Sequence, residues 1–268
     1  MKNLILTIVS TLISLVAYSQ DHSYDIIINL DDRIVDHNQI DRDISIIENA
    51  FIDWKQSVKD QYYIKSNGSF RVLVTDQKSM PALVNDIAIT LQIDLSNVSL
   101  ADKRRLVDDF EANLRDRIKS LYEAAYLGNN KNLYSGANLW KYFNSIYIDE
   151  IQRSPGIQNH IILLTDGYVD FESAPTMISK ATKYSSTSFI TSLRTLDWKD
   201  RIVNVGLMGC NIDLSDVTIS IYELSPKVDF PYELQILKHI YNDWFMEMGA
   251  LSVSTKGKTN TIKYASVR

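Results

Sequence analysis

The chain has 268 residues, of which 45% are hydrophobic and 23% are charged, and its formal net charge is −5. This composition is that of a globular protein with a hydrophobic core, and the acidic balance argues against the basic surface that nucleic-acid binding requires. The single cysteine, Cys210, cannot form an internal disulfide. We expect Cys210 to be a small buried residue at the end of a strand.

Residues 1–19 have the order of features of a secretory signal. A basic start at Lys2 precedes an apolar run, Leu4–Val16, and small residues precede a predicted cleavage ahead of Gln20. The run is shorter than the roughly 20 apolar residues that a membrane-spanning helix needs, although an uncleaved anchor helix is the alternative. We therefore expect an exported bacterial envelope protein, periplasmic or extracellular, in which residues 20–268 form one domain without a further membrane span.

The rest of the chain alternates two kinds of pattern. Apolar runs bounded by turn residues predict strands, and apolar residues three and four positions apart predict helices. In chain order, the predicted elements are a strand at Tyr24–Asp32, a helix at Gln39–Tyr62, a strand at Ser69–Thr75, a short helix opening at Pro81, a strand at Ile87–Leu95, helices at Ser99–Tyr126 and Ala137–Ile151, strands at Asn159–Thr165, Arg201–Leu207 and Val217–Leu224, and a helix at Pro231–Met248.

This alternation predicts the fold class. Apolar strands followed by amphipathic helices favour a doubly wound, mostly parallel sheet flanked by helices, which is a three-layer α/β sandwich. We expect Ser99 to cap its helix, Leu106 to face the core, and residues 250–267 to add an edge hairpin. In such sheets ligands bind beyond the carboxyl ends of the strands, so the residues that follow the strands are the functional candidates.

Three segments resemble the metal-site loops of the von Willebrand factor A family, and they occur in the family's order. The D-x-S-x-S that ends the family's first strand corresponds to Asp31–Val35, its G-T-N-L to Gly136–Leu139, and its T-D-G to Thr165–Gly167. The resemblance covers Tyr24–Met248. It implies the Rossmann-type sandwich of that family and a binding function at the strand ends.

The resemblance also implies a metal-ion-dependent adhesion site, in which hydroxyls and acids hold Mg²⁺ or Mn²⁺ and a partner supplies a carboxylate. Asp31 and Asp166 match the family's acids, but Arg33 and Val35 replace its serines and Ala137 replaces its threonine. Arg33 would bring a positive charge to the place where the ion should bind. Two like charges at 4 Å repel by roughly 4 kcal/mol at an effective dielectric near 20. The simplest interpretation of this degenerate site is that Arg33 takes the place of the ion and pairs with Asp31 or Asp166.

Two other interpretations stay open. Either a weak Mg²⁺ or Mn²⁺ site persists with Asp32, Asp170 or Ser135 as compensating ligands, or these acids are merely solvated or capping residues. Two aromatic residues near the last loop are either exposed anchors for a partner or loop residues that pack against the rim of the sheet. The residues that we expect in partner-binding loops are Asp32, Ser135, Gly136, Asn138, Gly167, Tyr168, Asp170 and Phe171.

Together these features predict an exported, non-enzymatic domain that binds a protein or another macromolecule of the cell envelope, most simply without any cofactor. A structural or assembly subunit of the envelope is the alternative. A phosphotransfer enzyme is a further alternative, but its D-x-D motif needs an acid where Arg33 stands. The chain has no G-x-S-x-G elbow and no phosphate-binding glycine loop, and its histidines lack metal-ligand spacing.

Overall fold

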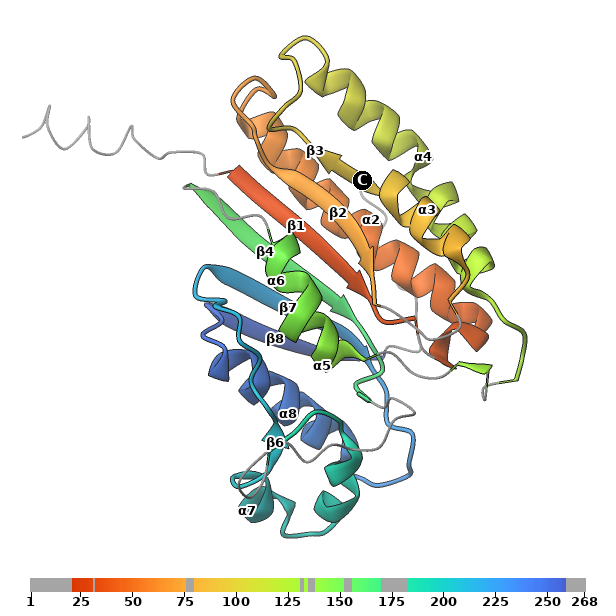
Figure 1. Cartoon of the computed structure of the whole chain (residues 1–268), viewed down its shortest axis with the longest axis vertical. Coiled ribbons are helices and arrows are strands. Elements are labelled where there is room, and N and C mark those ends of the chain that lie inside the picture. Colours follow the sequence, from red (N-terminus) through yellow and green to blue (C-terminus); the bar gives the residue numbers. More distant parts are fainter. Residues whose placement is uncertain are drawn as a thin grey trace, which may run out of the picture.

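Six strands form the central sheet, in the order β3-β2-β1-β4-β7-β8 (Figure 1). The computed structural model of the protein describes residues 21–30, 32–75, 80–130, 133–134, 138–151, 156–169 and 183–258. Neighbouring strands of this sheet are parallel, except that β3 runs antiparallel to β2 at one edge. The strands are β1 (Asp21–Ile28), β2 (Ser69–Val74), β3 (Gln92–Asp94), β4 (Ile157–Leu164), β7 (Val217–Leu224) and β8 (Ser252–Gly257), and β5 (Lys183–Tyr184) pairs with β6 (Gly206–Leu207) in a separate small sheet.

Helices cover both faces of the central sheet (Figure 1). One face packs against α2, α3 and α4, and the other against α5, α6, α7 and α8. None of the helices within the described residues is both long and apolar enough to span a membrane. The helices are η1 (Asp32–Val35), α2 (His37–Asp60), α3 (Ala82–Thr90), α4 (Lys103–Ala125), α5 (Leu139–Lys141), the π-helical η3 (Tyr142–Ile146), α6 (Tyr147–Glu150), η4 (Ser188–Leu193), α7 (Trp198–Ile202) and α8 (Glu233–Glu247).

The order of the strands places a topological switch point between β1 and β4. The chain runs outward from β1 through β2 to β3, returns to the other side of β1, and continues outward through β4, β7 and β8. The connections that leave β1 and β4 therefore diverge, and a crevice opens beyond their carboxyl ends. This topology confirms the predicted α/β class with a mostly parallel, helix-flanked sheet.

The central strands are apolar on both faces because each face meets a separate layer of helices. In β1, Ile26 and Ile28 pack in the cluster that contains α2, whereas Ile27 packs in the cluster that contains α8. Leu164 and Leu163 of β4 divide between the two clusters in the same way. This arrangement explains why these strands read as uninterrupted apolar runs instead of alternating ones.

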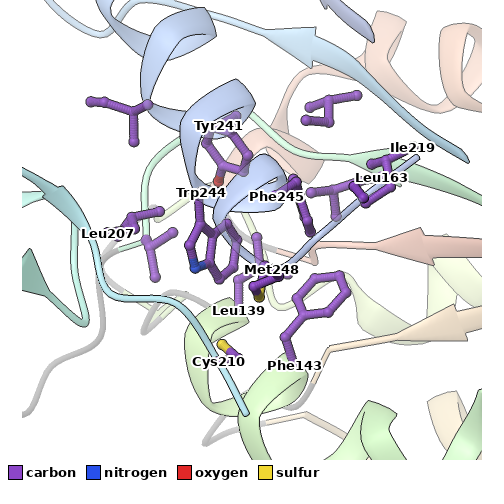
Figure 2. Packing of buried hydrophobic residues seen from close by; sticks show 14 of the residues in the cluster. Leu139, Phe143, Leu163, Leu207, Cys210, Ile219, Tyr241, Trp244, Phe245 and Met248 are labelled. Carbon is purple, nitrogen blue, oxygen red and sulfur yellow. The ribbon is translucent and has the colours of Figure 1, made fainter. Parts of the chain in front are cut away.

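The cluster around α8 is built on aromatic rings (Figure 2). Phe143 of η3 packs edge-on against Trp244 and Phe245 of α8, with ring centroids 5.6 and 5.2 Å apart. Cys210, which follows β6, is buried beside this cluster, as expected from the sequence. Burial raises the pKa of its thiol to about 12, so the thiol stays protonated at neutral pH.

An irregularity at the end of β7 turns one carboxylate toward α2. The pairing of β7 with β8 shifts register between Ile221 and Leu224, and Glu223 adopts a φ of 71°. A bulge of this kind re-aims a side chain that regular alternation would send to the other face. The Glu223 carboxylate accepts hydrogen bonds from Gln39 and Arg42 of α2 at 3.1 and 2.9 Å. A non-glycine residue at such a φ persists only where its surroundings hold it.

The predicted strand at Arg201–Leu207 is wrong. Its first residues complete α7, a turn follows, and only Gly206 and Leu207 form the short strand β6. Trp198 and Ile202 are both buried and lie four residues apart, which is the spacing of a helix face. A short apolar run does not by itself distinguish a strand from a buried helical turn.

The start of α4 also differs from its prediction. The helix begins at Lys103, and Ser99 belongs to a preceding turn in which its hydroxyl donates to Asp102 Oδ2 at 2.6 Å. Leu106 is 38% exposed, and Val107 takes the buried position instead. Val107 lies three residues before Phe110 and seven before Leu114, so it shares their buried face, whereas Leu106 lies at its edge.

Three further predictions need adjustment. Residues 87–90 belong to α3, so that only Gln92–Asp94 form the edge strand. The π-helical η3 interrupts the helix predicted at Ala137–Ile151. The predicted edge hairpin contributes one strand, β8, which runs parallel to β7, while residues 259–268 lie outside the described residues.

Phe143→Ala tests whether η3 anchors the α8 layer. We expect it to lower the free energy of unfolding by about 3–5 kcal/mol, because it deletes a fully buried ring that contacts four others, two of them on α8. Denaturant unfolding followed by circular dichroism measures the change. Ile148→Ala on α6, where the side chain is 38% exposed, is the control and should cost less than about 1 kcal/mol. Similar losses in both variants would contradict this assignment.

Candidate functional site

A pocket of about 490 Å³ lies where four strands of the central sheet end. Its walls come from the segments that follow β1, β4, β7 and β8, so it occupies the switch point of the sheet. We call it the rim pocket. It is lined by Asp32, Arg33, Val35, Asp36, Gln39, Asp166, Glu223, Ser225, Pro226, Lys227 and Lys258.

An ammonium group stands between two acids of this pocket. Lys227 Nζ lies 2.9 Å from Asp166 Oδ2 and 3.3 Å from Asp32 Oδ1. It also lies 5.0 Å from the centre of the Tyr168 ring, within the range of a cation–π interaction. The Asp166 side chain is only 6% exposed, so its charge needs a nearby cation, and Lys227 provides it.

The turn after β4 fixes the position of Asp166. Its Oδ1 accepts a hydrogen bond from the Tyr168 amide at 2.9 Å, and the Thr165 hydroxyl accepts one from the Gly167 amide at 3.1 Å. Gly167 has a φ of 98°, and a Cβ there would lie 2.9 Å from the Leu224 side chain. The Thr-Asp-Gly sequence is therefore required by the geometry of this turn.

The loop between β7 and α8, which carries Lys227, is attached to the same turn. The Ser225 amide donates to the Asp166 carbonyl at 2.9 Å, and the Lys227 amide donates to the Tyr168 hydroxyl at 3.0 Å. That hydroxyl in turn donates to Glu233 Oε1 at 2.7 Å. Burial raises the pKa of Tyr168 to about 12, so the phenol keeps the proton that it donates.

Tyr168 is therefore not the exposed anchor that one sequence interpretation expected. Its side chain is 8% exposed and packs against the rim, as the other interpretation held. Gly167 is likewise buried in the turn. Asn138 caps α5, because its side-chain oxygen accepts a hydrogen bond from the Lys141 amide at 2.8 Å. The contacts of Tyr168, Gly167 and Asn138 therefore stabilise the fold of their own segments.

Arg33 pairs with a residue that the sequence analysis did not name. Its NH2 group donates to Asp43 Oδ2 at 3.0 Å, and its Nε donates to the Asn29 carbonyl at 3.1 Å. The expected pairing with Asp166 is wrong, because β1 ends at Ile28 and η1 then directs the guanidinium toward α2. The other expected partner, Asp31, lies outside the described residues.

The Arg33–Asp43 pair belongs to a buried network on α2. Asp43 is fully buried and also accepts hydrogen bonds from the Tyr122 hydroxyl and from Gln39 Nε2, the latter at 2.9 Å. Gln39 connects this carboxylate to that of Glu223. Arg33, Gln39 and Glu223 line the rim pocket, and this network of hydrogen bonds, which includes the buried Asp43, holds them in place.

A second chain of ion pairs closes the side of the pocket at β8. Arg42 bridges Glu223 and Asp36, at 2.9 and 3.0 Å, and Lys258 Nζ lies 2.7 Å from Asp36. Burial would raise the pKa of Asp36, but hydrogen bonds from Lys258 and Arg42 outweigh it and lower the pKa to about 2. Asp36 is therefore ionised throughout the neutral range, and it ties the end of β8 to the start of α2.

The remaining predicted site residues lie outside the described residues. They are Asp31, Ser135, Gly136, Asp170 and Phe171. Sequence reasoning missed Lys227, although one signal for it exists: it follows the strand predicted at Val217–Leu224, whose carboxyl end must meet the same edge of a parallel sheet as that of the strand before Asp166.

The described donors do not fit the Mg²⁺ or Mn²⁺ ion that the resemblance implies. Mg²⁺ requires six oxygen ligands in an octahedron, whereas an ammonium stands between Asp32 and Asp166. Within the described ranges, no three His, Cys, Asp or Glu side chains converge as metal ligands would.

Two histidines meet at the opposite end of the sheet. His22 Nδ1 and His160 Nε2 lie 2.9 Å apart, and the His160 ring stacks on Tyr24 with centroids 4.5 Å apart. Burial, together with the charge of His22, lowers the pKa of His160 to about 4. The pair is thus neutral at neutral pH and lies at the amino-terminal half of β1 and β4, away from the rim pocket.

No protein-family model matches the chain, and no curated protein shows significant sequence similarity to it.

Arg33→Met tests the buried network. We expect a loss of about 3–5 kcal/mol in the free energy of unfolding, because the substitution leaves the buried Asp43 carboxylate without its cation. Combining it with Asp43→Leu should restore part of this loss, since the buried charge is then removed. Arg115→Met breaks an exposed pair with Glu48 and is the control, with an expected cost below about 1 kcal/mol. Denaturant unfolding measures the wild type, Arg33→Met, Asp43→Leu, the double variant and Arg115→Met, and strictly additive costs for Arg33 and Asp43 would contradict the coupling.

The histidine pair predicts a pH dependence of stability. The folded-state pKa of His160, about 4, lies below the value of about 6.5 that histidine has in an unfolded chain. Between these pH values His160 is protonated in the unfolded chain but not in the folded chain. The free energy of unfolding therefore falls as the pH drops through this window. His160→Gln should flatten the slope of unfolding free energy against pH there, while the difference between the two proteins stays constant above about pH 7.5. Parallel curves at all pH values would contradict this prediction.

Proposed function

We propose that this protein is an exported, non-enzymatic binding domain that engages a protein of the cell envelope through the rim pocket, without a divalent ion. The observation that carries the proposal is the position of the pocket, at the switch point of a doubly wound sheet. In open α/β sheets, this is the place where ligands bind. The export part of the proposal rests on the signal-like residues 1–19.

The chemistry of the pocket favours recognition over catalysis. Its acids face basic partners: Asp166 and Asp32 face Lys227, while Asp36 and Glu223 face Arg42. Such pairs hold charges of both signs in the walls of the pocket, where Lys227 and Asp36 are partly exposed, and they suit a partner that presents complementary charges. The chain's one thiol is buried elsewhere and keeps its proton at neutral pH, which makes it a poor nucleophile.

A relationship to the von Willebrand factor A family is part of the proposal. It is supported by the Thr165–Gly167 turn, which follows β4 at the switch point, where the family's metal-site loops are expected. The departure from the family is chemical: we propose that the charges of the rim pocket replace the ion. Partner binding should accordingly resist chelators and weaken with salt, because part of the pocket's charge is exposed to screening.

Capture of a partner by the purified domain, residues 20–268, tests the proposal. Wild-type protein and a Lys227→Gln/Lys258→Gln variant are immobilised and exposed to envelope extract in buffer containing EDTA. We expect the wild type to retain a discrete partner and the variant to lose most of it, because both lysines line the pocket and are partly exposed. Lys119→Gln, on the exposed side of α4, is the matched control and should behave as wild type.

Three results would count against the proposal. Equal capture by the wild type and the double variant would separate binding from the rim pocket. Capture by the wild type in buffer containing Mg²⁺ that is lost completely in EDTA would show that an ion is needed after all. Recovery of the same chain as the sole partner would favour an assembly subunit of the envelope instead.

A further inference from the structure

We infer that Lys227 is a tethered cation: its ammonium occupies the position that a divalent ion would take between Asp32 and Asp166, and a neutral side chain at this position would convert the rim pocket into a divalent-cation site. The inference rests on the proposed function, which makes the rim pocket a binding site. Its test involves no partner, so the inference and the proposed function can fail separately.

The contacts of the ammonium are those of a bound ion. A single nitrogen lies 2.9 Å from one carboxylate oxygen and 3.3 Å from another, and the two acids follow different strands, β4 and β1. Mg²⁺ binds oxygen at 2.0–2.1 Å, so the two carboxylates would need to close by only about 1 Å to hold such an ion in place of the nitrogen. Two of the six oxygen ligands of such an ion are therefore close to their required places around Lys227, and water would have to supply others.

The position of Lys227 is built by its loop. The backbone amide of Lys227 donates to the Tyr168 hydroxyl, and the Ser225 amide donates to the carbonyl of Asp166 itself. The ammonium also lies over the face of the Tyr168 ring. The loop that carries Lys227 is thus attached to the turn that carries Asp166. The Lys227 side chain therefore spans only a short distance to the carboxylate.

The electrostatics explain why removal of the charge should create affinity for an ion. Asp166 Oδ2 is buried and makes no hydrogen bond within the described part of the chain, so the 2.9 Å contact with Lys227 is what neutralises it. Without the ammonium, two carboxylates would face one point in a partly buried pocket. A cation bound there would remove their repulsion and the cost of the unpaired buried charge.

Another lysine of the same pocket provides a matched control. Lys258 also lines the pocket and is also partly exposed, but its Nζ pairs with Asp36. Neutralising Lys258 changes the net charge of the pocket by the same amount and leaves the contact between Lys227 and Asp166 in place. A general increase in negative charge can therefore be distinguished from the opening of a specific site.

Mn²⁺ is the probe. Its binding to wild-type protein, Lys227→Met, Lys258→Met, Asp166→Asn and Lys227→Met/Asp166→Asn is followed by the loss of the EPR signal of free Mn²⁺, with folding checked by circular dichroism. We expect Lys227→Met to bind Mn²⁺ at least about tenfold more tightly than the wild type, because it exposes two charged oxygen ligands. Lys258→Met should resemble the wild type, and the double variant should lose the gain.

Several outcomes would overturn the inference. They are a folded Lys227→Met that binds no better than the wild type, an equal gain in Lys258→Met, and a wild type that already binds as tightly and loses Mn²⁺ in Asp166→Asn. If Lys227→Met does not fold, the ¹H–¹⁵N signal of the Lys227 ammonium group in the wild type provides the test. That signal should be protected and should disappear in Asp166→Asn, and an unprotected signal would overturn the inference.

Discussion

The Asp166 carboxylate is buried at the end of a central strand, and its charge must be balanced there. Lys227 provides the balance from a loop that belongs to a different part of the chain. Backbone hydrogen bonds from Ser225 and Lys227 attach this loop to the turn after β4 and so position the ammonium, and the same loop forms one wall of the rim pocket. Because the cation is covalently part of the protein, the pocket carries its full set of charges at any concentration of divalent ions.

The rest of the site follows from the sheet. The switch point between β1 and β4 brings the ends of four strands to one crevice, and each strand end contributes a charged residue to it. Behind the crevice, α2 holds the buried network of Arg33, Asp43 and Gln39. The irregular end of β7 sends Glu223 into the same network at the cost of an unfavourable φ. Backbone strain retained at a pocket is consistent with a functional role for that pocket.

A charge-paired pocket implies a particular style of binding. A divalent ion holds a partner through strong, directional coordination that a chelator abolishes, whereas paired side chains offer weaker, salt-sensitive contacts that depend on complementary charge. We propose that Lys227 stands where the von Willebrand factor A family, which the sequence resembles, holds its ion. Under this proposal the place of recognition is kept, and recognition depends on ion pairing instead of coordination.

Local sequence patterns determined most of the elements, because the periodicity of long segments reports which side chains face the core. The predictions for α2, β7 and α8 are confirmed for this reason, and the doubly wound, mostly parallel class followed from their alternation. The strand predicted at Arg201–Leu207 is wrong because so short an apolar run fits a helix turn equally well. The types of residue at the strand ends, acids and an arginine, were also evident from the sequence.

Only the tertiary structure decided which of these charges pair. The sequence offered Asp31 or Asp166 as the partner of Arg33, and the way the chain leaves β1 directs Arg33 to Asp43 on α2 and not to Asp166. Lys227 meets Asp166 because β7 lies beside β4 in the sheet, a neighbourhood that no local pattern encodes. Ion pairing depends on distances of a few ångströms in space, and the chain separation of two residues does not determine that distance once the chain has folded.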